Sequence, residues 1–127
     1  MLTDRAGSSA WLLAGWVVYS NESKQRELAV PAKLLKQHGA VSVEVVASLV
    51  RAARQRSGAD LAVAISGIAG PGGSEFKPEG RVCFALACAQ GTQSETQEFG
   101  ALGRPAVRQA ALDHALNLIR VHLNSAH

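Results

Sequence analysis

The stretch DLAVAISGIAGPGG, residues 60–73, decides the fold that the sequence predicts. Its first half, from Asp60 to Ser66, is a short and almost wholly apolar run bounded by glycine, which is the pattern of a central strand covered on both faces. Its second half has four glycines in seven residues, which is typical of a loop whose backbone amides approach an anion closely. A strand that ends in such a loop predicts an α/β domain with a ligand site at the carboxyl edge of its sheet.

Helix and strand signals alternate on both sides of this stretch. Before it, apolar residues recur at the helical period between Ser42, a good N-cap, and Gly58, which ends the helix. The other predicted elements are a strand from Trp11 to Tyr19, a helix from Glu22 to about Ala29 capped by Asn21, a second helix from Pro31 to Gly39, strands from Arg81 to Ala89 and from Gln93 to Phe99 joined by a tight turn, and a long helix from Pro105 to Leu123. This order predicts an α/β fold on a mixed, mostly parallel sheet with one antiparallel hairpin.

The last helix is amphipathic, and its apolar residues form two adjacent rows. The rows are Val107, Ala111, Ala115 and Leu118, and Leu112, Leu116, Ile119 and Leu123. We expect both rows to lie against the sheet.

Length and composition indicate one domain over residues 1–127, because the chain has 127 residues, of which 47% are hydrophobic and 18% charged. The net charge of +3 is small and scattered, which argues against a nucleic-acid-binding surface. The apolar run from Ala10 to Tyr19 is about half of the ~20 residues that a membrane span needs. The start around Asp4 and Arg5 does not resemble a secretory leader. We therefore expect a cytoplasmic protein with no nucleic-acid or membrane partner.

The cysteines and histidines indicate neither a disulfide nor a metal site. Cys83 and Cys88 are five apart in one predicted strand, so their side chains face opposite sides and cannot bridge each other. Free buried thiols are the favoured interpretation over a redox pair. His114 and His122 are eight apart on a helix, with no cysteine at the spacing of a zinc site. We expect no metal and no cofactor.

Three polar or glycine-rich loops follow predicted strands. They cover residues 19–24, 66–73 and 100–105. If the strands are parallel, their carboxyl ends meet at one edge of the sheet, where ligands bind in open α/β folds. We expect the three loops to share one rim.

Two of these loops are candidates for binding an anion. The glycine loop contains neither the Walker nor the dinucleotide motif, but its bare amides could hold a phosphate; the alternative is a mobile surface loop closed by Pro78 and Gly80. Arg104 stands at the start of the last helix, where the helix dipole and free N–H groups attract anions and a guanidinium adds bidentate recognition. The alternative for Arg104 is an ordinary solvated arginine.

The first loop contains a candidate catalytic amine. Lys24 lies in the first turn of a predicted helix, where the dipole disfavours a cation and lowers the pKa of a lysine; the alternative is a surface lysine beside Glu22. Tyr19 closes the apolar run and either brings a phenol to the rim or is a core tyrosine. Ser42 is most simply a cap.

Several stretches, taken in order, resemble the C-terminal domain of the competence/damage-inducible CinA family. They are Gly7-Ser8-Ser9, residues 19–24, Gly39 to Ser42, Ser57 to Val63, Gly67 to Gly73, Lys77-Pro78 with Gly80, and Gly103-Arg104. They cover nearly the whole chain, and their combination is specific although any one alone is not. The resemblance implies a three-layer α/β/α sandwich on a mixed sheet. It also implies deamidation of nicotinamide mononucleotide, which is hydrolysis of a carboxamide to a carboxylate and ammonia.

The resemblance also implies a role for individual residues. Lys24 becomes the general base, and Tyr19 helps to orient it. The substrate-binding residues are Asn21 and Ser42 as polar support, Ser66 where the family usually has threonine, Gly67, Gly70, Gly72 and Gly73 as the ligand loop, and Arg104 as the contact to the phosphate. The implied partner is a small-molecule nucleotide.

One family segment is absent from this sequence. Family members carry Glu-Ser-Cys-Thr-Gly-Gly upstream, and its serine is the expected nucleophile. Residues 1–5 align only with the end of the helix that this segment opens, so we expect the first helix, the first strand and most of the second helix of the family fold, and the larger N-terminal domain, to be missing. We do not expect Ser20, Ser42 or Ser66 to replace the nucleophile; attack by a lysine-activated water is the alternative.

The missing segment has a consequence for assembly and leaves other functional classes open. Loss of a strand and a helix uncovers a sheet edge and an apolar face, which predicts a homo-oligomer. Besides an amidohydrolase, the chain is compatible with a catalytically silent module that binds a nucleotide or phosphate. A third possibility is a structural remnant that only oligomerises.

Overall fold

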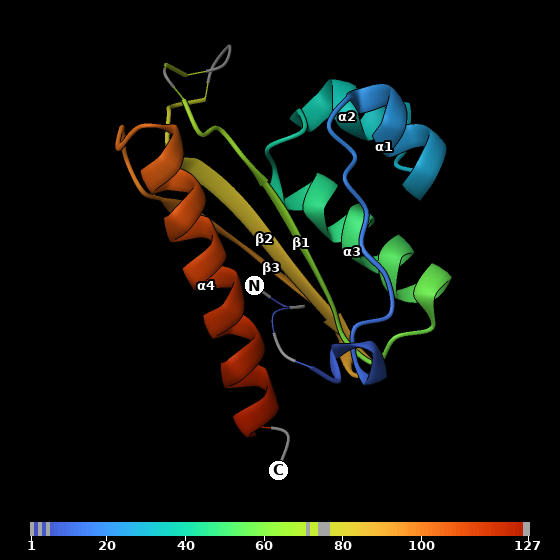
Figure 1. Cartoon of the computed structure of the whole chain (residues 1–127). Helices are drawn as coiled ribbons and strands as arrows, with labels where there is room; N and C mark the ends of the chain where they lie inside the picture. The colour runs from blue at the N-terminus through green and yellow to red at the C-terminus, as the bar shows by residue number, and fades with distance from the viewer. Residues whose placement is uncertain (1, 3, 5, 71, 74–76, 126–127) are drawn as a thin grey trace.

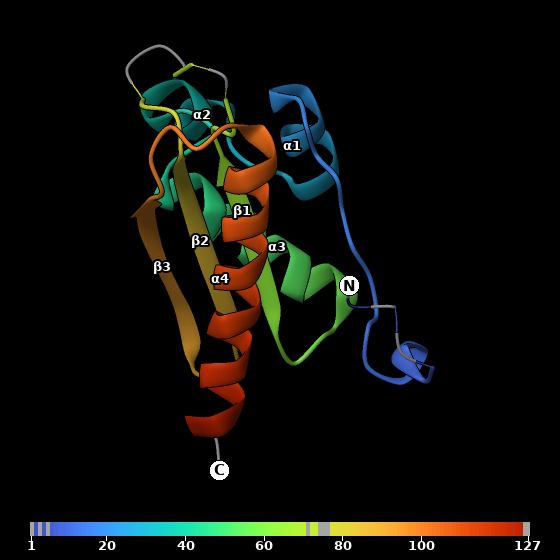
Figure 2. The ribbon, with the colours of Figure 1, turned by 60° about the vertical axis from the view of Figure 1, so that its left-hand side comes forward.

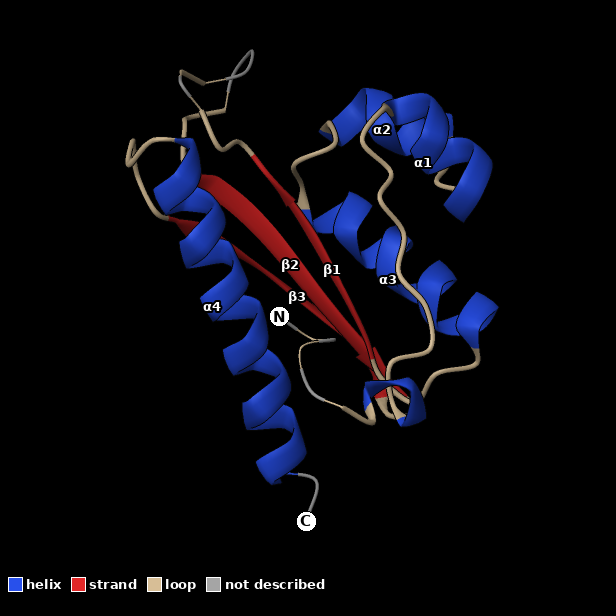
Figure 3. Ribbon diagram, in the orientation of Figure 1, coloured by secondary structure: helices blue, strands red, loops and turns tan. Residues whose placement is uncertain are grey.

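The computed structural model describes residues 2, 4, 6–70, 72–73 and 77–125, and shows one sheet between two layers of helices (Figures 1 and 3). Residues 1, 3 and 5 of the aligned start lie outside the described residues. The elements are η1 (Ser8–Ala10), α1 (Asn21–Leu28), α2 (Ala32–His38), α3 (Val43–Ser57), β1 (Ala62–Gly67), β2 (Arg81–Cys88), β3 (Gly91–Glu98) and α4 (Arg104–Ser125). The described strands form a three-stranded sheet in the order β1-β2-β3.

β2 is covered by both helical layers, and residues 82–87 of it are buried. On one face, residues 83, 85 and 87 of β2 pack against Val46 and Val50 of α3. On the other face, residues 82 and 84 pack against Val107 and Ala115 of α4. A strand covered on both faces needs apolar residues at every position, which explains the continuous run VCFALA at residues 82–87. Figure 2 shows α4 on one side of the sheet and α3 on the other.

The expectation of a mostly parallel sheet is wrong. β1 pairs antiparallel with β2, with Ala62 opposite Ala87 and Gly67 opposite Val82, and β2 pairs antiparallel with β3. The chain passes from β1 to β2 through residues 68–80, whose described part contains no helix. Parallel neighbours need a longer crossover, usually a helix, so this connection gives an antiparallel pair. β1 and β3 still run in the same direction, and their carboxyl ends lie at one end of the sheet.

β1 lies at an edge and not in the centre as its sequence predicts. Within the described strands it pairs with β2 alone. Its Ala64 packs toward the α3 layer, but Ile65 on the other face is 44% exposed. The residues of β1 are half-buried or exposed, so its apolar composition predicted neither full burial nor its position within the sheet.

The predicted strand over residues 11–19 is not part of the sheet. The segment runs as coil from η1 to α1 across α3 (Figure 1). It keeps the alternation of a strand, because Trp16 and Val18 pack against the core whereas Val17 and Tyr19 are 94% and 86% exposed. No described strand pairs with this segment. Its side chains therefore alternate between buried and exposed although its backbone makes no hydrogen bonds to the described sheet.

The helix caps explain where α1 and α3 begin. Ser20, and not Asn21, caps α1, because the Ser20 side chain accepts the backbone N–H of Ser23 at 3.0 Å. Ser42 caps α3 as predicted, and Gly58 ends that helix in the left-handed conformation.

α4 confirms one of its two predicted rows. Val107 and Ala115 are buried, and Ala111 and Leu118 pack with them against β2. In the second row, Leu112 and Ile119 are half-buried but Leu116 and Leu123 are exposed, because α4 turns one side to solvent (Figure 2). Among the described residues, none of the helices combines the length and the hydrophobicity that a membrane span requires.

Candidate functional site

Lys24 is a buried charged residue on the inner side of α1. It is 6% exposed, and its Nζ donates a hydrogen bond to the carbonyl O of Tyr19 at 3.1 Å. Burial removes water from the ammonium group and lowers the pKa of Lys24 below its ordinary value. The direction agrees with the sequence-based expectation, and its cause here is burial, which the sequence did not predict. A lysine with a lowered pKa is a candidate proton acceptor.

Tyr19 reaches Lys24 through its backbone and not through its phenol. The Tyr19 side chain is exposed, so it is not a core tyrosine. The Ser20 cap and a hydrogen bond from Ser23 Oγ to the Ser20 carbonyl at 2.8 Å fix the chain where it enters α1. This local network holds the Tyr19 carbonyl within reach of the amine. Asn21, the first residue of α1, is exposed at the same end of the helix.

The glycine loop follows β1 and is held where it leaves and re-enters the sheet. The N–H of Ile68 donates to the Arg81 carbonyl at 2.9 Å, and the N–H of Gly80 donates to the Ile68 carbonyl at 2.7 Å. A Cβ at Gly67 would lie 2.8 Å from the Val82 side chain, so this position needs glycine for close approach. Pro71 and residues 74–76 of the loop lie outside the described residues.

Glu79 is a residue of this region that sequence reasoning missed. One of its carboxylate oxygens accepts the backbone N–H of Gly72, and the other accepts the N–H of Gly103 at 3.3 Å. The carboxylate therefore connects the glycine loop to the turn before α4. A single glutamate between Pro78 and Gly80 gave no local signal for such a contact.

Arg104 is the first residue of α4 and is exposed next to that turn. The free N–H groups and the positive end of the helix dipole lie at this point. The structure thus brings Arg104 and the glycine loop together through Glu79. The start of α1 lies at the same end of the molecule in both views (Figures 1 and 2). Within the described part of the chain, however, the Lys24 amine has a polar contact with Tyr19 alone.

Ser42 and Ser66 occupy structural positions near the glycine loop. The Ser42 hydroxyl donates to the Gly39 carbonyl at 2.7 Å and accepts the Val45 N–H at 3.2 Å, so it caps α3. Ser66 is half-buried near the end of β1, opposite Cys83.

Lys77 is the second residue that sequence reasoning missed as a contact. Its Nζ donates to the carbonyl groups of His38 and Val41, 39 and 36 residues away in the sequence. These contacts tie the end of the glycine loop to the turn between α2 and α3. In the sequence, Lys77 stands out only as part of a stretch that resembles the family.

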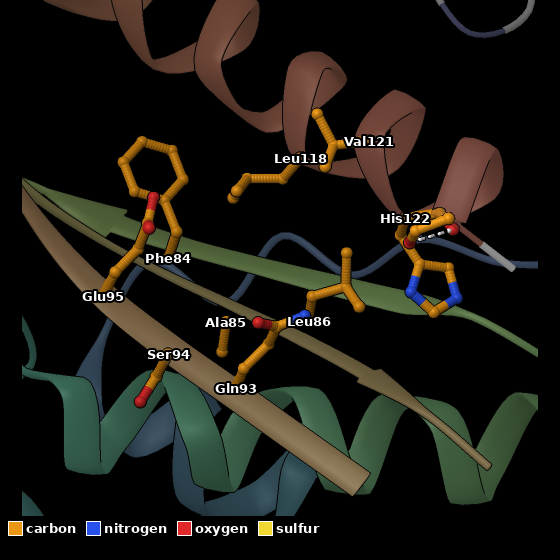
Figure 4. Close-up of a pocket in the computed structure, with 10 residues that line it drawn as sticks. Phe84, Ala85, Leu86, Gln93, Ser94, Glu95, Leu118, Val121 and His122 are labelled. Carbon is orange, nitrogen blue, oxygen red and sulfur yellow. Dashed lines mark hydrogen bonds between the residues drawn. The ribbon is translucent and has the colours of Figure 1, made fainter. Parts of the chain in front are cut away.

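Two cavities lie near the sheet, and the predicted site residues line them only in part. An open cavity of about 390 Å³ is lined by Ser42, Lys77 and polar residues of β2 and β3. A second cavity of about 280 Å³ lies between the carboxyl half of α4 and strands β2 and β3, with Phe84, Leu118 and Glu95 among its lining residues (Figure 4). Among the described residues that line these two cavities, neither Lys24 nor Arg104 is present.

Comparison with known proteins connects this arrangement to a family. The model of the CinA C-terminal domain matches residues 1–123. The chain belongs to the CinA C-terminal domain family. This CinA domain is 48% identical over 120 residues to the nicotinamide-nucleotide amidohydrolase PncC of Escherichia coli K12, covering 94% of the chain and 73% of that protein. It is also 48% identical over 124 residues to a CinA-like protein of Synechococcus sp., covering 96% of the chain and 30% of that protein.

Solved CinA structures have the same fold. The competence/damage inducible protein CihA from Agrobacterium tumefaciens matches with a TM-score of 0.90 at 39% identity, covering 97% of this chain and 75% of that one. The competence damage-inducible protein A from Klebsiella pneumoniae matches with a TM-score of 0.92 at 34% identity, covering 97% and 76%. The CinA domain described here spans about 30% of the length of the CinA-like relatives.

Proposed function

We propose that this CinA domain hydrolyses the carboxamide of nicotinamide mononucleotide to give nicotinate mononucleotide and ammonia. The observation that carries the proposal is the buried Lys24 amine held on the Tyr19 carbonyl, in a chain 48% identical to a protein named nicotinamide-nucleotide amidohydrolase. Burial lowers the pKa of Lys24, which enlarges the neutral fraction of the amine. A neutral amine can accept a proton from the attacking group.

In the proposed reaction, Lys24 moves one proton in each of two steps. The neutral amine removes a proton from a water molecule as the water oxygen bonds to the carboxamide carbon. The carbon–nitrogen bond then breaks, and the Lys24 ammonium returns the proton to the departing nitrogen, so that ammonia leaves and a carboxylic acid remains, which releases its proton to solvent and becomes the carboxylate. A serine nucleophile would take the place of water in a protein that carries the family's upstream segment. The Tyr19 carbonyl holds the amine in position for both transfers.

The other groups of the site are proposed to bind the nucleotide. Arg104 and the free N–H groups at the start of α4 suit a phosphate, and the glycines at 67, 70, 72 and 73 give the loop beside them its shape. Asn21, Ser42 and Ser66 are proposed as polar support. Hydrolysis consumes only water in addition to the nucleotide. We place the reaction in the cytoplasm, because the free thiols Cys83 and Cys88 suit a reducing compartment.

Ammonia release tests the proposal directly. The purified chain is incubated with nicotinamide mononucleotide, and both ammonia and nicotinate mononucleotide are measured. Equal amounts of the two products are expected. A rise in melting temperature with the nucleotide but without ammonia would select a silent nucleotide-binding module instead. If the nucleotide causes neither ammonia release nor a rise in melting temperature, the structural remnant is the remaining possibility.

We also propose that the chain self-associates through the outer side of β1. Within the described strands β1 has one free edge, and Ile65, Leu116 and Leu123 are exposed apolar residues on β1 and α4. Unpaired strand edges and exposed apolar surface both favour association. Sedimentation velocity at micromolar concentration should show a dimer or larger species, and a monomer would contradict this part of the proposal.

A further inference from the structure

The carboxylate of Glu79 lies between two segments that are far apart in the sequence. One oxygen accepts the N–H of Gly72 in the glycine loop, and the other accepts the N–H of Gly103 before α4, 24 residues from Glu79. Glu79 is half-buried; its contact to Gly103 is half-buried as well, whereas its contact to Gly72 is open to solvent. Hydrogen bonds to an ionised acceptor are about twice as strong as neutral ones.

The surrounding backbone makes room for Glu79 and fixes its starting point. A Cβ on Gly70 would collide with the Glu79 carboxyl group, and Gly70 is buried with a φ of +92°. The N–H of Gly80 donates to the Ile68 carbonyl at 2.7 Å, and the Gly80 carbonyl accepts the N–H of Phe99 at 2.9 Å. The Glu79 side chain thus extends from backbone that is tied to the ends of both β1 and β3.

From these contacts we propose that Glu79 is a positioning residue, which clamps the glycine loop to the turn that carries Arg104. The clamp sets the spacing between the loop and the Arg104 guanidinium. Its effect on catalysis rests on the proposed function, because that spacing matters to turnover only if the nucleotide phosphate binds there. The clamp itself rests on the contacts of Glu79, and it can be tested without any ligand.

Amide hydrogen exchange of the whole chain, measured by NMR, tests the clamp. In Glu79→Ala we expect the amides of Gly72 and Gly103 to exchange together about tenfold faster or more, because each loses its hydrogen bond to a charged acceptor. The amide of Ala85 in β2 should keep its rate. Glu79→Gln, which retains one acceptor oxygen without the charge, should give a smaller acceleration and covers the case in which Glu79→Ala does not fold.

A matched control separates the clamp from a general effect of charge. Asp113→Ala removes another carboxylate, one that accepts from Gln109 on the exposed side of α4, and it should leave both glycine amides unchanged. If either glycine amide keeps its wild-type rate in the Glu79 variants, the proposal is overturned. It is also overturned if Ala85 accelerates equally, since that would indicate a global loss of stability.

A kinetic measurement links the clamp to the proposed function. In the ammonia assay, Glu79→Ala should raise KM for nicotinamide mononucleotide about tenfold while kcat changes less than about twofold, because misplaced binding groups weaken binding and leave the base in place. An unchanged KM would overturn the positioning role. If the wild-type chain releases no ammonia, the proposed function fails, and the exchange rates alone then decide whether the clamp exists.

Discussion

Two corners of the molecule contain the candidate chemistry, and they are built in different ways. The Lys24 corner is local, because the Tyr19 carbonyl, the Ser20 cap and the Lys24 amine all lie within residues 19–24. The glycine-loop corner is assembled from distant segments, since Glu79 joins Gly72 to Gly103. A short sequence motif can specify the hydrogen bonds of the first corner, whereas those of the second exist only after the sheet has formed.

The two corners also treat charge differently. The Lys24 ammonium is buried, and its pKa is lowered by the loss of water. The Arg104 residue is exposed, and a guanidinium can hold an anion by bidentate hydrogen bonds. The first environment suits proton transfer and the second suits anion binding. If this division is real, changes in the first corner should affect kcat and changes in the second should affect KM.

Removing the Lys24 amine should give the largest effect. In Lys24→Met we expect kcat for ammonia release to fall about 100- to 10,000-fold, the usual contribution of a positioned base, while far-UV and near-UV circular dichroism stay unchanged. Lys36→Met, at an exposed position of α2, is the matched control and should keep full activity. Retained turnover in Lys24→Met would end the assignment of this corner to proton transfer.

Removing the Arg104 guanidinium should affect binding instead. We expect Arg104→Ala to raise KM about 10- to 150-fold, which corresponds to about 1.5–3 kcal/mol for charge-assisted hydrogen bonds to phosphate. Arg108→Ala, one turn further along α4 and also exposed, should leave KM within about twofold. A Michaelis constant that does not change in Arg104→Ala would argue against the phosphate contact and against the division between the corners.

The caps beside the two corners should differ in their effect on stability. Ser42 is buried and makes two hydrogen bonds through its hydroxyl, whereas Ser20 is exposed. We expect Ser42→Ala to lower the free energy of unfolding by about 1–2 kcal/mol and Ser20→Ala by about 0.5–1 kcal/mol, both measured by urea titration. Ser48→Ala, in the interior of α3, is the control and should change stability little. If Ser42→Ala and Ser20→Ala lower the free energy of unfolding equally, burial does not make the Ser42 cap more important for stability than the Ser20 cap.

The smallest expected effect is on the pH dependence of stability. The pKa of Lys24 in the folded protein lies below its ordinary value of 10.5, so the folded state binds fewer protons than the unfolded chain between these two pKa values. The free energy of unfolding of the wild type, relative to that of Lys24→Met, should therefore rise with pH across that window. Below the lowered pKa, Lys24 is protonated in both states, and its buried charge lowers the free energy of unfolding by a constant amount. A relative stability that falls with pH would contradict the burial of Lys24.

Caps and hydrophobic patterns in the sequence predicted where most helices and strands lie, but they did not predict how the strands pair. Ser42 and Gly58 marked the ends of α3, and the predicted strand from Arg81 to Ala89 matches β2 to within one residue. The direction of β1 and its place at an edge could not be predicted, because they depend on which strands are available to pair with it. The run at residues 11–19 failed for the same reason, since its alternating pattern needs a partner strand to become β-structure.

The candidate site divides in the same way. Sequence reasoning singled out Lys24 because its surroundings are contiguous, but it did not predict the burial of Lys24, since burial depends on how α1 packs. The contacts of Lys77 and Glu79 span up to 39 residues, and no spacing rule connects those positions. The glycines of the loop stood out in the sequence, whereas the contact of the Gly72 amide with the Glu79 carboxylate did not.

The position of β2 between two hydrophobic cores couples the two helical layers mechanically. Its backbone is common to two cores, because Phe84 belongs to the core under α4 while Ala85 belongs to the core under α3. A change in volume at either residue shifts the same strand and is felt in the opposite layer. Heating should therefore melt the helices on both faces in one cooperative transition, and neither helical layer should survive as an independent folding unit.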